Sequence, residues 1–145
     1  YMKPLMPKAG VLTKAKPSKE QMADILFGFD VAKQMGGLDI GQTVVVKDMA
    51  VMAIEAIEGT DACIKRGGAL GRGNAVVVKT AKPRQDVRFD VPAVGLTTIQ
   101  SMLDSDCKIL AMEAERTIFV EQAEVIKLAN EKGLIICAVD GPEEE

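Results

Sequence analysis

The sequence contains no histidine and no tryptophan, and only 3% of its 145 residues are aromatic. The absence of histidine excludes Ser-His and Cys-His nucleophile pairs, imidazole acid–base catalysis and histidine-ligated metals. Any catalysis must therefore use carboxylates, lysine, arginine, hydroxyl groups or a hard metal ion. Oxygen ligands favour magnesium, manganese or calcium over zinc. The scarcity of aromatic residues predicts a core of Val, Ile, Leu, Ala and Met.

Three further features are missing. The net charge of −3 gives no basic excess of the kind that nucleic-acid binding requires. No apolar run approaches the roughly 20 residues that span a bilayer, and the N-terminus lacks a signal-peptide layout. Cys63, Cys107 and Cys137 form no C-x-x-C pair, so we expect reduced, buried thiols in a cytoplasmic protein.

The length suits a single domain with its own core. Pro4, Pro7 and Pro17 interrupt the opening segment, which has no clear periodicity. We therefore expect residues 1–16 to be a linker from a preceding domain, residues 17–140 to be one folded domain, and residues 141–145 to be an acidic, frayed tail.

The apolar pattern of the first half alternates between helix and strand. Ser18 and Gln21 form a capping-box pattern that begins a helix, which ends at Gly36-Gly37. The runs TVVV and AVMAIEA then predict a β-hairpin. Thr60 is the expected N-cap of a short helix, and the glycine-rich residues 67–73 should end it. A strand should follow over residues 74–79.

The second half predicts a helix from Thr97 or Thr98, a second hairpin (KILAMEA and TIFVE), a helix ending at Gly133 and a closing strand, LIICAV. The order hairpin–helix–strand thus occurs twice, over residues 43–79 and 108–139, as a weak duplication. The fold class predicted is α/β (mixed α+β), with a mixed sheet, β-hairpins and about four helices.

The polar segment KTAKPRQDVRFD, residues 79–90, is the first candidate site. It follows an apolar strand, where functional loops commonly lie. Its cationic and acidic residues occur together, as binding of phosphate through cations and a metal requires. The alternative is a solvated loop, which is the usual reading of a charge cluster.

A second polar cluster contains Glu55, Glu58, Thr60 and Asp61. Taken alone, it is best explained by helix capping, and Lys65-Arg66 lies about one helical turn beyond Asp61, as an exposed charge pair would. The glycine-rich residues 67–73 offer backbone amides to a phosphate, but they match no nucleotide-binding fingerprint.

Several long motifs resemble a known family: DIGQTVVVKDMAVMAIEAIEGTD, KRGG, VVVKTAKPRQDVRFDVPAVGLTTI and AMEAERTIFVE. They are similar to the C-terminal domain of the UDP-2,3-diacylglucosamine pyrophosphatase family of Gram-negative lipid A biosynthesis, from about Pro17 to Val139. Family members carry a separate N-terminal domain. Met49 and Glu115 depart from the family pattern at turn positions where glycine is expected.

The resemblance implies magnesium-dependent hydrolysis of UDP-2,3-diacylglucosamine to UMP and 2,3-diacylglucosamine 1-phosphate (lipid X). The implied catalytic residues are Asp90, Asp86, Lys79, Lys82 and Arg88. The implied substrate-binding residues are Gln85, Glu58 and Thr60. The implied metal ligands are Asp90, Asp86 and Asp61.

The implied partners are the UDP-diacylglucosamine substrate and the N-terminal domain of the same protein, without nucleic acid. Peripheral contact with the inner membrane and homo-oligomer formation stay open. Two rival functions also remain: a non-catalytic domain that binds a nucleotide sugar or lipid phosphate, and a structural assembly domain. The second leaves residues 79–90 without a purpose.

Overall fold

A computed structural model describes residues 6–82 and 91–141. Its elements, in chain order, are β1 (Gly10–Val11), α1 (Lys19–Gly37), β2 (Thr43–Lys47), β3 (Ala50–Ile54), α2 (Thr60–Gly71), β4 (Ala75–Lys79), β5 (Ala93–Val94), α3 (Leu96–Asp104), β6 (Cys107–Glu113), β7 (Ile118–Phe119), α4 (Gln122–Lys132) and β8 (Ile135–Val139). The predicted α/β class, with a mixed sheet and four helices in these residues, is confirmed.

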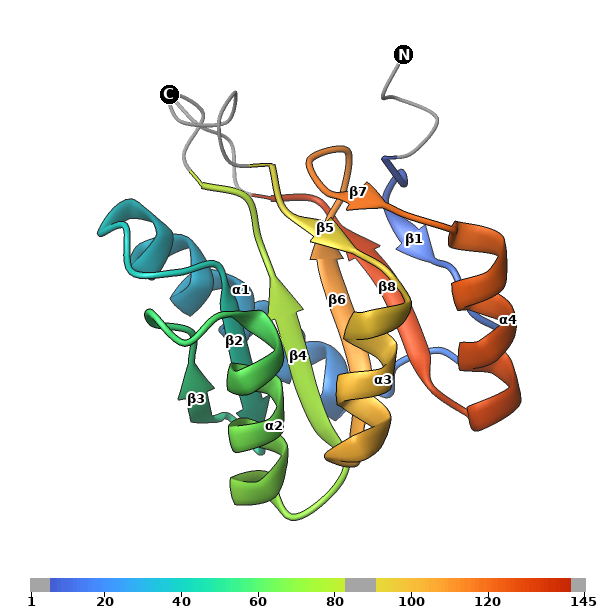
Figure 1. Cartoon of the computed structure of the whole chain (residues 1–145), viewed down its shortest axis with the longest axis horizontal. Coiled ribbons are helices and arrows are strands. Elements are labelled where there is room, and N and C mark those ends of the chain that lie inside the picture. Colours follow the sequence, from blue (N-terminus) through green and yellow to red (C-terminus); the bar gives the residue numbers. More distant parts are fainter. Residues whose placement is uncertain (1–5, 83–90, 142–145) are drawn as a thin grey trace.

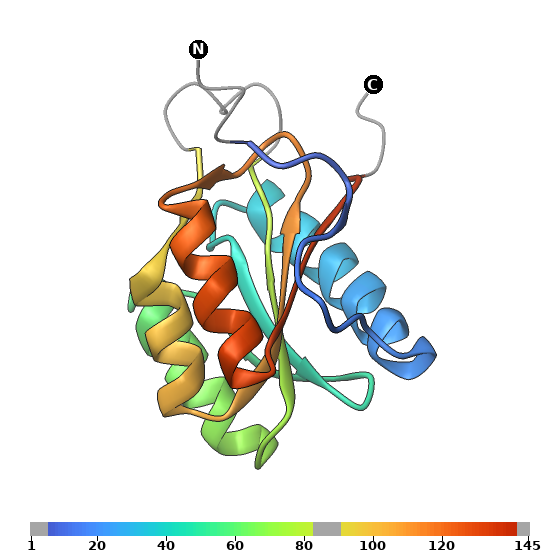
Figure 2. The same cartoon turned by 90° about the vertical axis from the view of Figure 1, so that its right-hand side faces the viewer.

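Six strands form the main sheet in the order β1-β8-β6-β4-β2-β3. The central strands β4, β6 and β8 are parallel, whereas β2, β3 and β1 are each antiparallel to a neighbour. Helices α2, α3 and α4 cover one face and α1 covers the other (Figures 1 and 2). β5 and β7 form a separate parallel pair.

The core follows the alternation of side chains along the strands. Val45, Val77, Leu110 and Ile136 face α2, α3 and α4, while their neighbours in sequence face α1. Because the central strands are covered on both faces, they are continuous apolar runs rather than alternating ones. Both layers of the core therefore depend on the same few strands, through alternate residues.

The capping box predicted for α1 is confirmed. The backbone N–H of Gln21 donates to Ser18 Oγ over 3.1 Å, and the N–H of Ser18 donates to Gln21 Oε1 over 2.8 Å. The hairpin β2–β3 is also confirmed. Asp48 and Met49, in its turn, have φ angles of 50° and 62°, as a tight hairpin requires.

Asp24 on α1 holds that turn. Its buried carboxylate accepts the backbone N–H of Asp48 over 3.2 Å and that of Met49 over 2.8 Å. Glu115, the other residue that departs from the family's glycine pattern, has a φ of 60°. Both departures thus lie at left-handed positions, where glycine costs least.

The second predicted hairpin is wrong, and the hairpin–helix–strand duplication fails with it. β6 pairs in parallel with β4 and β8, and Ile118–Phe119 pair with β5 instead of β6. The apolar run of β6 is buried on both faces, which is typical of a central parallel strand.

One prediction about α2 is wrong and another is confirmed in part. Gly59 is the N-cap and Thr60 is the first helical residue. The helix does end within the glycine-rich residues 67–73, at Gly71, but most of that segment is helical. A Cβ on Gly67 would lie 2.4 Å from Val45 Cβ, so this glycine allows α2 to approach the sheet closely.

Part of the segment expected to be a linker joins the sheet. Gly10 and Val11 pair with Ala138 and Cys137 of β8, and Thr13 Oγ1 accepts the N–H of Ile136 over 3.1 Å. The hydrogen bonds of these residues place them in the folded domain. The remaining domain boundaries stay predictions, and residues 142–145 of the expected tail lie outside the described residues.

Candidate functional site at the carboxyl edge of the sheet

β4, β6 and β8 all end at one edge of the sheet, which we call the carboxyl edge (Figure 1). α2, α3 and α4 each precede a parallel strand and begin at this edge. Helix N-termini carry partial positive charge and unpaired N–H groups, so they favour anions. In open α/β sheets, ligands bind outside the carboxyl ends of the strands. The carboxyl edge is therefore the expected place for a site.

Lys79, a predicted catalytic residue, is the last residue of β4 and is only 8% exposed. Its Nζ donates to Thr60 Oγ1 over 3.0 Å. Thr60 Oγ1 lies 3.4 Å from Glu55 Oε2, to which it donates, and 3.5 Å from Thr43 Oγ1. We call these four residues the Lys79 cluster. It joins a cation from the first candidate segment to the second predicted cluster at the N-terminus of α2.

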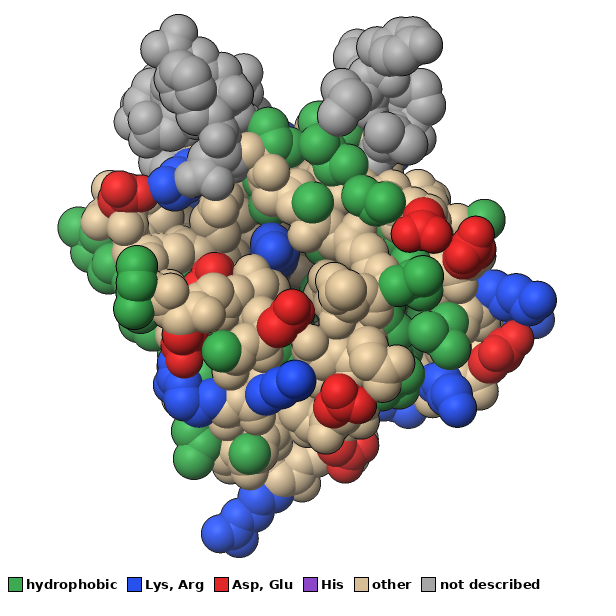
Figure 3. Space-filling view, viewed as in Figure 1, with side chains coloured by type: hydrophobic (Ala, Val, Ile, Leu, Met, Phe, Trp, Pro, Cys, Tyr) green, Lys and Arg blue, Asp and Glu red, His purple; other side chains and the backbone are tan. Residues whose placement is uncertain are grey.

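The surface around these helices carries both charges. Figure 3 shows Lys or Arg and Asp or Glu side chains interspersed on this face, with a Lys or Arg side chain at the floor of a hollow. The charges of the described residues are spread over the whole face and are not gathered at the carboxyl edge.

Asp61 and Glu58 have partners other than those expected. Asp61 Oδ1 accepts a hydrogen bond from Ser101 Oγ over 3.0 Å, which connects α2 to α3. Arg66 pairs with Glu58 instead of Asp61, with Arg66 Nε 3.3 Å from Glu58 Oε2. The hydrogen bond from Arg66 lowers the pKa of Glu58. The sequence spacing indicated Asp61 as the partner of the basic pair, whereas Arg66 pairs with Glu58.

Lys82 forms an ion pair with Asp39, which follows α1. Its side chain is 19% exposed, whereas that of Asp39 is 77% exposed. Among the described residues, Lys82 and Lys79 thus contact different partners. Asp86, Asp90, Arg88 and Gln85, predicted as catalytic, metal-binding or substrate-binding residues, lie outside the described residues.

Sequence reasoning missed a buried charge network on the α1 face of the carboxyl edge. Glu113, at the end of β6, is 1% exposed and pairs with Lys33 of α1 over 2.8 Å and with Arg116 over 3.3 Å. We call these three residues the Glu113 anchor. A signal was present in the sequence: a glutamate that ends the apolar run KILAM must be paired if it is buried.

Of the three predicted metal ligands, Asp61 lies within the described residues. Asp61 supplies a carboxylate near the carboxyl edge, and its oxygen chemistry suits magnesium. Residues 6–82 and 91–141 contain no group of three or more acidic or thiol side chains that could hold a metal ion. The other predicted ligands, Asp86 and Asp90, lie outside the described residues, so the magnesium site stays a prediction.

The three cysteines are buried free thiols, as predicted. Burial raises the pKa of Cys63 to about 12 and that of Cys137 to about 11, and it also raises that of Cys107. Because a thiolate is the reactive form, these side chains are inert at neutral pH. Among the described residues, no helix is both long enough and apolar enough to cross a membrane.

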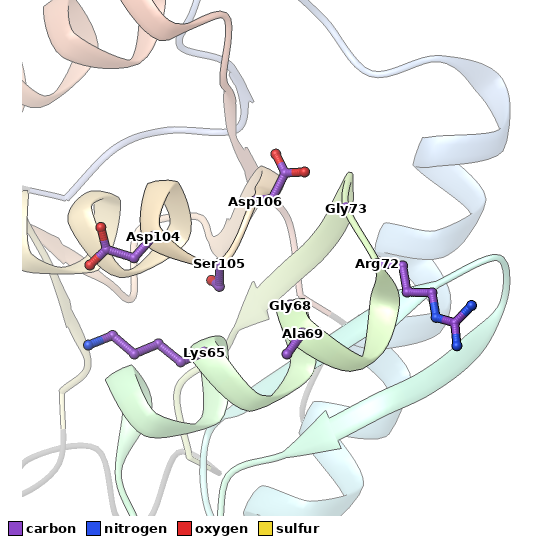
Figure 4. Close-up of a pocket in the computed structure, with 8 residues that line it drawn as sticks. All are labelled: Lys65, Gly68, Ala69, Arg72, Gly73, Asp104, Ser105 and Asp106. Carbon is purple, nitrogen blue, oxygen red and sulfur yellow. The ribbon is translucent and has the colours of Figure 1, made fainter.

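A cavity of about 560 Å³ opens at the opposite, amino edge of the sheet, between the C-terminal ends of α2 and α3. Lys65, Arg72, Asp104 and Asp106 surround it, and their charged ends point in different directions (Figure 4). None of the predicted site residues that the structure describes lines this cavity. Its size alone does not make it the site, because convergent polar groups are missing.

Comparison with known proteins agrees with the resemblance found in the sequence. A family model described as the LpxI C-terminal domain matches residues 8–137. The chain is 41% identical over 142 residues to a protein of Caulobacter vibrioides named UDP-2,3-diacylglucosamine pyrophosphatase LpxI. The match covers 92% of this chain and 51% of that protein, so the chain spans about half the length of this relative. The chain belongs to the LpxI C-terminal domain family.

Proposed function

We propose that the chain supplies the catalytic domain of a UDP-2,3-diacylglucosamine pyrophosphatase of lipid A biosynthesis, acting in the cytoplasm or at the inner face of the inner membrane. The reaction would add water across the pyrophosphate and release UMP and 2,3-diacylglucosamine 1-phosphate. Family membership supports the substrate. The observation that carries the proposal in the structure is the 3.0 Å contact of Lys79 with Thr60 at the N-terminus of α2.

The Lys79 cluster suits a phosphoryl group for two physical reasons. The ammonium group of Lys79 is buried, so its attraction for an anionic oxygen is less screened than at the surface. The N–H groups at the start of α2 supply further positive potential. Charge that develops on the leaving phosphate would be stabilised by groups already in place. Lys82 and Arg88 are proposed to add cationic charge.

Magnesium is proposed as the cofactor, held by Asp61, Asp86 and Asp90. Carboxylate oxygens are the ligands that this ion prefers, and the chain has no histidine to direct a different metal. When bound, the ion would neutralise charge on the pyrophosphate oxygens. Gln85, Glu58 and Thr60 are proposed to contact the substrate, although Glu58 is already paired with Arg66.

The test is release of UMP from UDP-2,3-diacylglucosamine, measured for the 145-residue chain alone and for a longer form that restores an N-terminal domain. We expect turnover that EDTA abolishes and magnesium restores. An Asp90→Ala variant should lose turnover but keep substrate binding. Tight binding without UMP release in either form would instead favour the non-catalytic nucleotide-sugar or lipid-phosphate binding domain.

A further inference from the structure

We propose that Glu113 is a positioning residue: together with Lys33 and Arg116 it fixes the backbone of Ala81 and Lys82, and thereby the starting geometry of the predicted catalytic segment. This inference rests on the proposed function, because Lys82 belongs to that segment. Glu113 is not proposed to touch the substrate.

The contacts of Glu113 join three separate parts of the chain. Its Oε1 accepts the backbone N–H of Ala81 over 2.9 Å and pairs with Lys33 Nζ over 2.8 Å. Its Oε2 pairs with Arg116 over 3.3 Å. One carboxylate therefore connects α1, the end of β6 and the residues that follow β4.

Both cations of the Glu113 anchor also bind the same stretch of backbone. Lys33 Nζ donates to the carbonyl of Ala81 over 3.1 Å, and the second guanidinium nitrogen of Arg116 donates to the carbonyl of Lys82 over 2.9 Å. Just before this stretch, Gln42 exchanges two hydrogen bonds with the backbone of Thr80. The backbone from Thr80 to Lys82 is thus held by side chains and loop residues after the regular strand has ended.

The register of the sheet explains why a side chain is needed at this point. Lys79 is the last residue of β4 to pair with β6, opposite Met112. Glu113 is the next residue on β6, so its carboxylate accepts the Ala81 N–H where the β4–β6 ladder stops. Ala81 is 1% exposed, and a buried N–H without a partner would be costly. The anchor lets the chain leave the sheet in a defined direction.

The carboxylate is enclosed as well as paired. A Cβ placed on Gly141 would lie 2.3 Å from Glu113 Oε2, so the backbone after β8 packs directly against the carboxylate. Glu113 cannot move aside easily, since three partners hold its two oxygens. The enclosed carboxylate thus restricts the backbone of Ala81 relative to β6.

A matched pair of variants tests the proposal in the longer form of the protein, which includes the N-terminal domain. Glu113→Gln replaces the carboxylate with an uncharged amide, whose NH2 group is a hydrogen-bond donor. Lys33 and Arg116 then lose their counter-charge. Asp24→Asn makes the same chemical change in another buried carboxylate that holds two backbone N–H groups, but at the β2–β3 turn. We expect kcat for UMP release to fall about 100-fold in Glu113→Gln, with KM changed less than about threefold, because misplacement affects the chemical step. For Asp24→Asn, kcat should stay within about twofold.

A second measurement separates this inference from the proposed function. The exchange rate of the Ala81 amide, followed by NMR, should rise in Glu113→Gln and stay unchanged in Asp24→Asn. If the wild-type protein releases no UMP, the proposed function is overturned. The exchange rate of the Ala81 amide would still test the Glu113 anchor in that case. An unchanged Ala81 exchange rate, or wild-type kcat in folded Glu113→Gln, would overturn the inference.

If Glu113→Gln fails to fold, Arg116→Lys replaces it. Lysine keeps the positive charge beside Glu113. It lacks the planar guanidinium group, whose two nitrogens contact Glu113 and the Lys82 carbonyl at the same time. We expect a smaller loss of kcat, about 10-fold, at nearly unchanged KM. Wild-type kcat in this variant would overturn the proposal.

Discussion

Two polar clusters lie at the carboxyl edge, on opposite faces of the sheet, and they are built differently. In the Lys79 cluster, side chains contact side chains, over distances of 3.0 to 3.5 Å. In the Glu113 anchor, the carboxylate contacts two cations and a backbone N–H, and its shortest contacts are 2.8 and 2.9 Å. The first arrangement leaves hydroxyl and ammonium groups that can reorient towards a ligand. The second holds the main chain, so its loss should alter the fold before it alters binding.

The largest expected effect comes from removing the centre of the anchor. Glu113→Ala leaves Lys33 and Arg116 without their buried counter-charge, which typically costs about 3–5 kcal/mol. Urea unfolding followed by circular dichroism should show this loss at pH 7. A loss no larger than that of an exposed residue would mean that water replaces the carboxylate, and the two clusters would then not differ as described.

Lys79→Met should have the opposite effect, with little change in stability and a large loss of activity. Methionine keeps the length and apolar contacts of the buried stem, so the urea midpoint should change little. The cation is lost, so kcat/KM for UMP release should fall about 100- to 1,000-fold, as when one oxyanion-stabilising donor is removed. Lys47→Met serves as a control, because Lys47 binds the carbonyls of Gly71 and Gly73 at the amino edge. Equal losses of activity in both variants would contradict the assignment.

Thr80 lies between Lys79, which belongs to one cluster, and Ala81, whose backbone N–H binds Glu113 of the other. Its substitution should change the stability by a smaller amount. It is fully buried, and its Oγ1 has no hydrogen-bond partner among the described residues. Thr80→Val removes this polar atom at nearly constant shape, so we expect stability to rise by about 1 kcal/mol. Urea unfolding measures the gain. A loss of turnover in a stabilised variant would show that the hydroxyl serves the reaction.

The smallest effect is expected at the exposed pair of Glu58 and Arg66. Arg66 lowers the pKa of Glu58 from 4.5, so the pair stabilises the fold above about pH 4.5, and this contribution is lost as the pH falls through the lower, folded-state pKa. Solvent screens the pair, so Glu58→Gln should barely shift the urea midpoint at pH 7. Comparing midpoints at pH 7 and pH 3 checks this. A raised KM for the substrate at unchanged stability would support the proposed role of Glu58 in binding.

The elements that the sequence predicted correctly are those specified by neighbouring residues. The capping box at Ser18 and the hairpin turn at Asp48-Met49 are local patterns, and both are present. The second hairpin failed because a buried apolar run such as KILAM reads the same in a hairpin and in a central parallel strand. Its partners, β4 and β8, are separated from it by whole helices.

The candidate site was predictable in the same partial way. Lys79 and Thr60 were each marked by their sequence context, but only the fold shows that they touch. Sequence reasoning missed the Glu113 anchor because each of its three charged residues, taken alone, could be an ordinary surface charge. Their contact depends on the packing of α1 against the sheet. Buried charge pairs join distant segments, so a local pattern does not specify them.

The pairing of β1 with β8 has a consequence for the timing of folding. The first strand of the described residues, β1, pairs with the last one, β8, so β1 cannot join the sheet until β8 has left the ribosome. Until then, residues 10–13 have no strand to join. The sheet should therefore be completed only after β8 has been synthesised, with slow closure typical of contacts between distant parts of a chain.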